Sequence, residues 1–185
     1  MDAGVKYGMP IIFMSFILAC GCISTSTKKV LREMYGAQLV LPSDMIVVKA
    51  GKTSLYKEQD SLSPLLLVYY DYAECGSCRI SKLEYLDTLY SLSERSGLYE
   101  MLVVFSPSSE EVPEILSQLT VRNYHNAVLI DVTGSFAKSN EFIPEESAYH
   151  CFLTDIERHP VFVGDPLASS AMWNLFIGKI SGKYP

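Results

Sequence analysis

The feature that most constrains the fold of this chain is a short apolar segment followed by two closely spaced cysteines. Residues Leu65–Tyr70 form a nearly continuous apolar run, Cys75 and Cys78 follow it, and a long amphipathic stretch begins at the second cysteine. A short run with β-branched and aromatic members is typical of a central strand covered on both faces. The order therefore predicts a buried strand, a turn that carries both cysteines, and a helix.

The spacing of the two cysteines indicates thiol–disulfide exchange. A helix N-terminus offers free N–H groups and a partial positive charge, and both favour the reactive thiolate. Two cysteines separated by two residues can close a small disulfide, while the first stays accessible to the sulfur of another molecule. We therefore predict that Cys75 is the attacking thiol and Cys78 the resolving thiol, and that the reaction needs no cofactor.

Other roles of the cysteine pair stay open. A closed zinc site usually needs four ligands, and no second pair with this spacing is present, so we expect no bound metal. The pair could instead form a structural disulfide, or persist on a fold that serves only for binding, because a fold does not determine a function. Copper handling is a further alternative, in which Cys75 and Cys78 act as soft ligands together with His150 or Cys151.

The N-terminal residues predict export and lipidation. Lys6 precedes an apolar run over residues 11–19, which has the composition of a secretory signal sequence. The run is shorter than the roughly 20 residues that span a bilayer as a helix, which disfavours a permanent transmembrane anchor. Residues 17–20 (ILAC) resemble a bacterial lipobox, which implies that Cys20 carries the lipid. Cleavage of an ordinary signal peptide is the alternative.

Length and charge limit the remaining classes. A chain of 185 residues without repeats is about the size of one domain with extensions. The formal charge is −6, and the basic residues are scattered along the chain, so we expect no binding of nucleic acid. Export would place the folded part in an oxidising compartment, and the lack of an acidic run after Cys20 favours a position facing the periplasm.

The other patterns predict alternating strands and helices. Strands are expected near residues 45–48, 101–105, 126–131, 149–154 and 159–163, and helices near 24–36, 78–97, 108–119 and 172–180. Residues 49–63 are polar and contain glycine, so we expect a loop there. Parallel crossovers followed by an antiparallel hairpin predict an α/β fold with a mixed central sheet flanked by helices.

A family resemblance adds to this prediction. Residues 70–78 (YDYAECGSC) resemble the redox turn of thioredoxin-like proteins. The segments 130–140 (IDVTGSFAKSN), 152–155 (FLTD) and 161–166 (VFVGDP) are similar to TlpA-related, thioredoxin-like lipoproteins of Bacteroides-type bacteria. The resemblance covers about residues 41–180, and it implies a thioredoxin-like fold with an inserted strand and a place in the cell envelope.

The chain departs from thioredoxin at three positions. Glu74 replaces the usual Trp before the first cysteine, and its carboxylate disfavours ionisation of the neighbouring thiol. Tyr69 stands where thioredoxin has a buried Asp that helps to move protons, and Tyr149 stands where it has a cis-proline that shapes the substrate groove. Glu74, Tyr149 and Cys151 are thus candidate accessory residues. Cys151 is either a resolving thiol or a small core residue.

These observations predict a signal peptide over residues 1–19, a lipidated N-terminal tether with a short helix over 20–40, and a thioredoxin-like domain over 41–185. The predicted function is that of a membrane-anchored thiol–disulfide oxidoreductase of the cell envelope, whose partners are protein disulfides or another envelope protein. The alternative is a non-enzymatic module that binds a neighbouring envelope complex.

Overall fold

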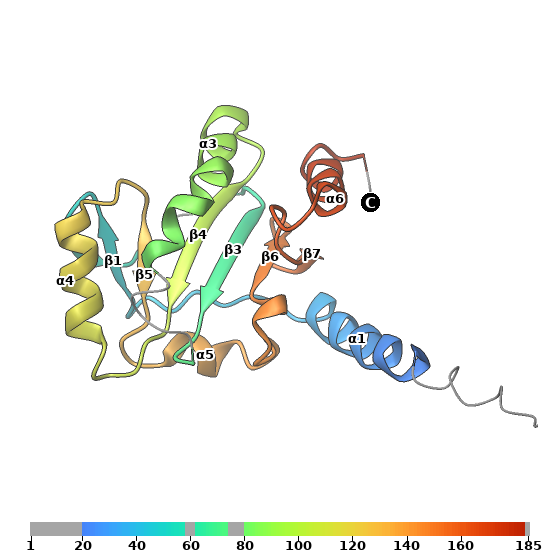
Figure 1. The fold of residues 1–185 in the computed structure, drawn as a ribbon, viewed down its shortest axis with the longest axis horizontal. Coiled ribbons are helices and arrows are strands. Elements are labelled where there is room, and N and C mark those ends of the chain that lie inside the picture. The colour runs from blue at the N-terminus through green and yellow to red at the C-terminus, as the bar shows by residue number, and fades with distance from the viewer. Residues whose placement is uncertain (1–19, 58–61, 74–79, 184–185) are drawn as a thin grey trace, which may run out of the picture.

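The computed structural model describes residues 20–57, 62–73 and 80–183. Within these ranges a seven-stranded sheet has the order β2-β1-β5-β4-β3-β6-β7 (Figure 1). The strands are β1 (Ile46–Lys49), β2 (Lys52–Leu55), β3 (Leu65–Tyr70), β4 (Glu100–Phe105), β5 (Val128–Ile130), β6 (Cys151–Thr154) and β7 (Pro160–Val163). The helices are α1 (Cys20–Tyr35), α3 (Asp87–Ser96), α4 (Val112–Arg122), α5 (Ser135–Ser139) and α6 (Ser170–Ile180), with 3-10 helices η1 (Leu83–Leu86) and η2 (Ser147–Tyr149).

The sheet is mixed, as predicted. Strand β3 pairs in parallel with β4 and antiparallel with β6, and β4 pairs in parallel with β5. Strands β6 and β7 form the expected antiparallel hairpin. The antiparallel pair β1 and β2 precedes the parallel strands, and the predicted hairpin follows them. The predicted α/β, thioredoxin-like architecture with a mixed sheet flanked by helices is confirmed.

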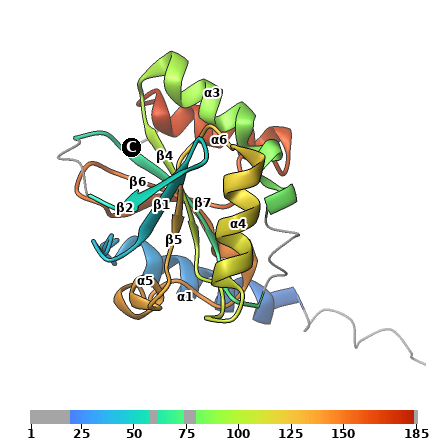
Figure 2. The ribbon, with the colours of Figure 1, turned by 90° about the vertical axis from the view of Figure 1, so that its left-hand side faces the viewer.

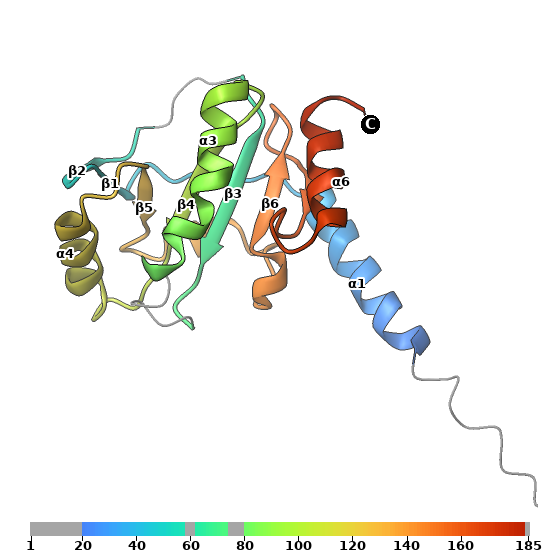
Figure 3. The same cartoon turned by 45° about the horizontal axis from the view of Figure 1, so that its top comes forward.

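Both faces of the sheet are covered by helices. Every residue of β3 is buried, and alternate side chains enter two different cores because successive side chains of a strand point to opposite faces. One core contains Leu66, Val68 and Tyr70 with residues of α3, α4 and α6, and the other contains Leu65, Leu67 and Tyr69 with residues of α1 and α5. Figure 3 shows α3 and α6 on the same side of the sheet, and Figure 2 shows α4 beside β1 and β5.

The amphipathic stretch after the cysteines differs from the continuous helix that we predicted. In the described part, a helical turn at Ile80 is followed by the 3-10 helix η1 and then by α3, which ends before Gly97. The predicted apolar face is nevertheless buried, with Ile80, Leu83 and Leu86 at most 3% exposed. These residues are three apart, and a 3-10 helix places such residues on one line, so it buries them as well as an α-helix does.

Residues 49–63, predicted as a loop, contain strand β2. It pairs antiparallel with β1 through a tight turn in which Ala50 and Gly51 have φ angles of 47° and 68°. Two central residues with positive φ are characteristic of the hairpin turns that match the twist of the strands. All four residues of β2 are exposed, so its side chains lack the alternation that reveals a strand, and only backbone pairing defines it.

The N-terminal helix is longer than expected. We predicted a helix that begins at the hydroxyl residues 24–27, whereas helical backbone is already described from Cys20. Its predicted end at Gly36 is confirmed, because α1 ends at Tyr35. Met34 is fully buried in the core beneath the sheet, and the helix then runs outward from the body of the protein toward its N-terminus (Figure 1).

Asparagine and aspartate side chains fix the segments at the edge of the second core. Asn140 donates to the carbonyls of Val40 and Phe136, each at 2.8 Å, and its Oδ1 accepts from the backbone N–H of Val40 at 2.8 Å. Asp131, 1% exposed, directly follows β5 and accepts the backbone N–H groups of Ser135 and Phe136 at 3.0 and 3.1 Å. Asp131 therefore caps the start of α5 from inside the protein.

We expect Asp131→Ala to destabilise the protein by roughly 2–3 kcal/mol, because it removes a helix cap and leaves buried donors without acceptors. Those donors include the hydroxyl of Ser106, which lies 2.9 Å from Asp131 Oδ2. Urea unfolding followed by circular dichroism measures the change in the free energy of unfolding. The exposed Glu141→Ala serves as the control, and equal stabilities of the two variants would contradict this role of Asp131.

Candidate functional site

The candidate site lies at the edge of the sheet where the parallel strands end. Because β3, β4 and β5 are parallel, the residues that follow them meet at one edge, where α/β proteins commonly bind ligands. The backbone ladder extends past the strands, since Ser106 N–H donates to Tyr70 O at 2.8 Å and Asp131 N–H donates to Phe105 O at 2.7 Å. This edge is therefore rigid up to the points where the loops leave it.

In the sequence, the predicted cysteine motif follows strand β3, which ends at this edge. Cys75, Cys78 and the neighbouring Glu74 lie outside the described residues, as does the predicted signal peptide. The described chain before them leaves the core at Asp71 and is exposed at Tyr72 and Ala73. The side chain of Asp71 accepts the N–H of Ala73 at 3.0 Å, which orders the start of this loop.

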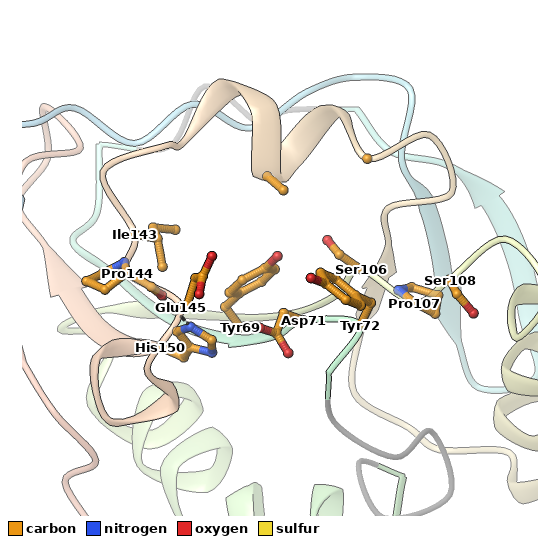
Figure 4. A pocket seen from close by; sticks show the side chains of 12 residues that line it. Tyr69, Asp71, Tyr72, Ser106, Pro107, Ser108, Ile143, Pro144, Glu145 and His150 are labelled. Carbon is orange, nitrogen blue, oxygen red and sulfur yellow. Dashed lines mark hydrogen bonds between the residues drawn. The ribbon is translucent and has the colours of Figure 1, made fainter.

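A pocket of about 340 Å³ opens at this edge, and we call it the edge pocket (Figure 4). It is lined by Tyr69, Asp71 and Tyr72 from the end of β3, by residues 106–108 after β4, by Gly134 and Ala137 at α5, by residues 143–145, and by His150. Figure 4 shows the side chains of Tyr69, Ser106 and Glu145 converging on the space between them. Five separate stretches of the chain thus build one concave surface at this edge of the sheet.

Tyr69 stands at the position where the resemblance to thioredoxin would place a buried Asp. It is 7% exposed, and its ring lies 5.1 Å from that of Phe136 and 5.0 Å from that of His150, measured between centroids. An aromatic cluster therefore fills the interior where a buried Asp would stand.

The ring of His150 packs against that of Tyr69, and His150 is 3% exposed. Its Nε2 lies 2.7 Å from the carbonyl oxygen of Pro144. A carbonyl can only accept, so Nε2 carries the hydrogen of this bond. In the described part of the chain this buried Nδ1 has no hydrogen-bond partner. His150 thus lines the pocket with a ring whose Nε2–H is already bound to a backbone carbonyl.

Tyr149 and Cys151 flank His150 on the way into β6. Tyr149 ends η2 and packs partly buried against the second core, and every described peptide bond is trans. Cys151 is a free thiol that pairs with Val68 in the sheet and packs partly buried against the first core. Burial, with a smaller contribution from the negative charge of Asp165, raises the pKa of the Cys151 thiol far above its usual value. Cys151 therefore stays protonated at neutral pH.

Sequence reasoning missed most of the edge pocket. Ser106, Glu145 and His150 were not predicted as members of one site. The end of the parallel strand β4 could have indicated Ser106, but Glu145 and His150 do not follow a parallel strand. The loop residues 143–145 carried no motif at all. Among the described residues, no three His, Cys, Asp or Glu side chains form a group able to hold a metal ion. None of the helices described here combines the length and apolar character needed to cross a bilayer.

The raised pKa of Cys151 predicts slow alkylation. An ordinary thiol is about half ionised at pH 8.5, whereas Cys151 stays protonated there because its pKa is raised, and only the thiolate reacts. We expect the native Cys151 to react with iodoacetamide at least about tenfold more slowly than in guanidinium chloride, as measured by peptide mass spectrometry. Similar rates in the two states would show that Cys151 is an accessible and reactive thiol.

Comparisons with known proteins find solved structures that are similar at low sequence identity. No protein-family description and no curated protein matches the chain. A thioredoxin-like protein of Porphyromonas gingivalis is 16% identical, with a TM-score of 0.46 over 77% of this chain and 90% of that one. The thioredoxin domain of a thiol-disulfide oxidoreductase from Bacteroides vulgatus is 14% identical, with a TM-score of 0.44 over 76% and 99%.

A third solved structure is an exposed lipoprotein thioredoxin of Streptococcus pneumoniae, 16% identical, with a TM-score of 0.42 over 73% of this chain and 98% of that one. At such identities a structural similarity concerns the fold alone. The order of the strands, with β4 parallel and β6 antiparallel to the central β3, is that of the predicted thioredoxin-like architecture. The chain therefore has a thioredoxin-like fold.

Proposed function

We propose that this protein is a thiol–disulfide oxidoreductase of the cell envelope, anchored to a membrane through Cys20. The observation that most supports the proposal is the position of the motif in the chain. In the sequence, Cys75 and Cys78 follow the central strand β3, which is buried on both faces. They precede Ile80, a helical residue whose side chain is buried in the core. A redox turn between two such elements has rigid supports on both sides.

The proposed reaction is an exchange of disulfide bonds. The thiolate of Cys75 attacks one sulfur of a substrate disulfide, forms a mixed disulfide and releases the other substrate sulfur as a thiolate. The thiolate of Cys78 then attacks Cys75, which releases the second substrate thiolate and leaves a Cys75–Cys78 disulfide. Two electrons have passed to the substrate, and a dithiol of a membrane partner returns them. The same steps in reverse would oxidise a substrate.

Exposure of the described residues just before the motif supports a protein substrate. Tyr72 is 73% exposed, and Ala73 is exposed as well, so the backbone that enters the motif is open to a second polypeptide. Cys151 does not take part in the proposed exchange, because its thiol stays protonated and reacts only as a thiolate. The two motif cysteines are therefore sufficient for the reaction.

The shape of the N-terminal region is compatible with an anchored protein. Helix α1 has 16 residues, which corresponds to a length of about 24 Å, and it points away from the sheet toward the N-terminus (Figure 1). A lipid on Cys20 would thus hold the domain at a distance from the membrane surface. The proposal places the domain in the periplasm, where a protein disulfide is stable.

Single serine variants test the reaction. We expect Cys78→Ser to accumulate mixed disulfides through Cys75, because the bond can form but the resolving thiolate is missing. Cys75→Ser should capture almost nothing, and Cys151→Ser should exchange disulfides at the rate of the natural protein. The measurement is a gel shift of trapped partners under nonreducing conditions, with the rate of reduction of a model disulfide as the second readout.

Two outcomes would contradict the enzymatic proposal. One is equal trapping by Cys75→Ser and Cys78→Ser, which would indicate nonspecific oxidation. The other is a Cys75–Cys78 pair that a strong dithiol cannot reduce without unfolding the protein, which would indicate a structural disulfide. If the double variant keeps an envelope partner while no exchange is found in the natural protein, the chain is a binding module instead.

A further inference from the structure

We propose that the edge pocket binds the cationic side chain of a lysine or arginine in the substrate polypeptide. The inference rests on the proposed function for one point, namely that the occupant belongs to a polypeptide. The preference for a cation comes from the described residues of the pocket itself, which combine aromatic faces with hydrogen-bond acceptors and carboxylates.

The polar groups of the pocket are predominantly acceptors. The hydroxyl of Ser106 donates to Asp131 Oδ2 at 2.9 Å, and that of Ser108 donates to Glu111 Oε2 at 2.9 Å, so both oxygens keep free lone pairs. His150 uses its Nε2–H on the Pro144 carbonyl, so this N–H is not offered to a ligand. A ligand that fits these groups must supply several donors.

The charges of the edge pocket also favour a cationic ligand. Asp71 and Glu145 line the pocket, whereas none of its lining residues is Lys or Arg. Within the described residues neither carboxylate forms an ion pair. An anionic ligand would be repelled there, and a neutral one would leave both carboxylates without a counter-ion. A positively charged group with several N–H donors complements both features.

The aromatic walls favour the same chemistry. Tyr69 and Tyr72 stand on either side of Asp71 in Figure 4, and the ring of Tyr72 is largely exposed. The face of a tyrosine ring attracts an ammonium or guanidinium group, and the ring edge packs against the methylene stem of a long basic side chain. A volume of about 340 Å³ lies at the lower end of the range of ligand pockets, which suits one extended side chain.

The position of the pocket indicates a polypeptide as the occupant. Asp71 precedes Cys75 by four residues, so their α-carbons are at most about 14 Å apart. A substrate held at Cys75 would therefore bring the residues within about four positions of its own cysteine to the pocket. We infer that a basic residue at this spacing marks the preferred substrates.

The test measures binding without redox chemistry. The probes are acetylated, amidated hexapeptides in which serine replaces the reactive cysteine and either lysine or norleucine lies three residues away. They are titrated into the full chain carrying Cys75→Ser and Cys78→Ser, and the backbone amide signals are followed by NMR, which detects millimolar affinities. We expect the lysine peptide to bind at least about fivefold more tightly and to shift the signals of Ala73 and Ser106.

Charge variants in the same background identify the site. Asp71→Asn with Glu145→Gln should weaken binding of the lysine peptide by about tenfold, because each substitution removes a charge but keeps an oxygen acceptor. Glu141→Gln with Glu146→Gln is the matched control, since both residues are exposed, lie in the same loop region and do not line the pocket. The control should change the affinity by less than about twofold.

Each alternative outcome overturns a specific part of the inference. Equal binding of the norleucine peptide overturns the preference for a cation, and equal weakening by both double variants overturns the pocket as its site. Cadaverine that binds as tightly as the lysine peptide identifies a small amine as the occupant. Absence of any shift overturns the inference as a whole. Disulfide exchange by the natural protein is measured separately, so its failure affects only the proposed enzymatic function.

Discussion

Burial of β3 on both faces is the constraint on which the rest of the structure depends. Its six residues alternate between two cores, and neither core could close without helices on its own side of the sheet. Truncating one such buried residue to alanine typically costs about 2–5 kcal/mol, a large part of the stability of a domain. The strand is therefore held in one register, and the chain that leaves it at Asp71 starts from a fixed point.

The end of β3 at Asp71 lies at the edge of the sheet that carries the edge pocket. The ends of β3, β4 and β5 meet there, and buried polar groups hold the loops that leave it: Asp131 caps α5, and His150 binds the carbonyl of Pro144. The edge pocket is rigid for the same reason that the core is stable. Exposed groups at its rim, such as Tyr72 and Glu145, are free to meet another molecule. A motif that follows this edge would combine a supported backbone with an open surface.

Predictions from the sequence were most accurate where the hydrophobic pattern is strong. The buried strand Leu65–Tyr70, the helix end at Gly97 and the hairpin formed by β6 and β7 all follow from periodicity or from a turn residue. The prediction for residues 49–63 was wrong, because β2 exposes all its side chains and is defined by backbone pairing with β1. The 3-10 helix η1 was missed because a spacing of three residues satisfies both types of helix.

The sequence by itself determined the class of the fold and the cysteine pair that motivates the proposed chemistry, since both are properties of residues close together in the chain. Only the tertiary structure decided which distant residues share the edge pocket, and that the Cys151 thiol stays protonated. Tyr69, Ser106 and His150 carry no common sequence signal, because their proximity arises from the pairing of β3 with β4 and β6. Burial and charge at a site depend on such long-range contacts, which periodicity along the chain does not encode.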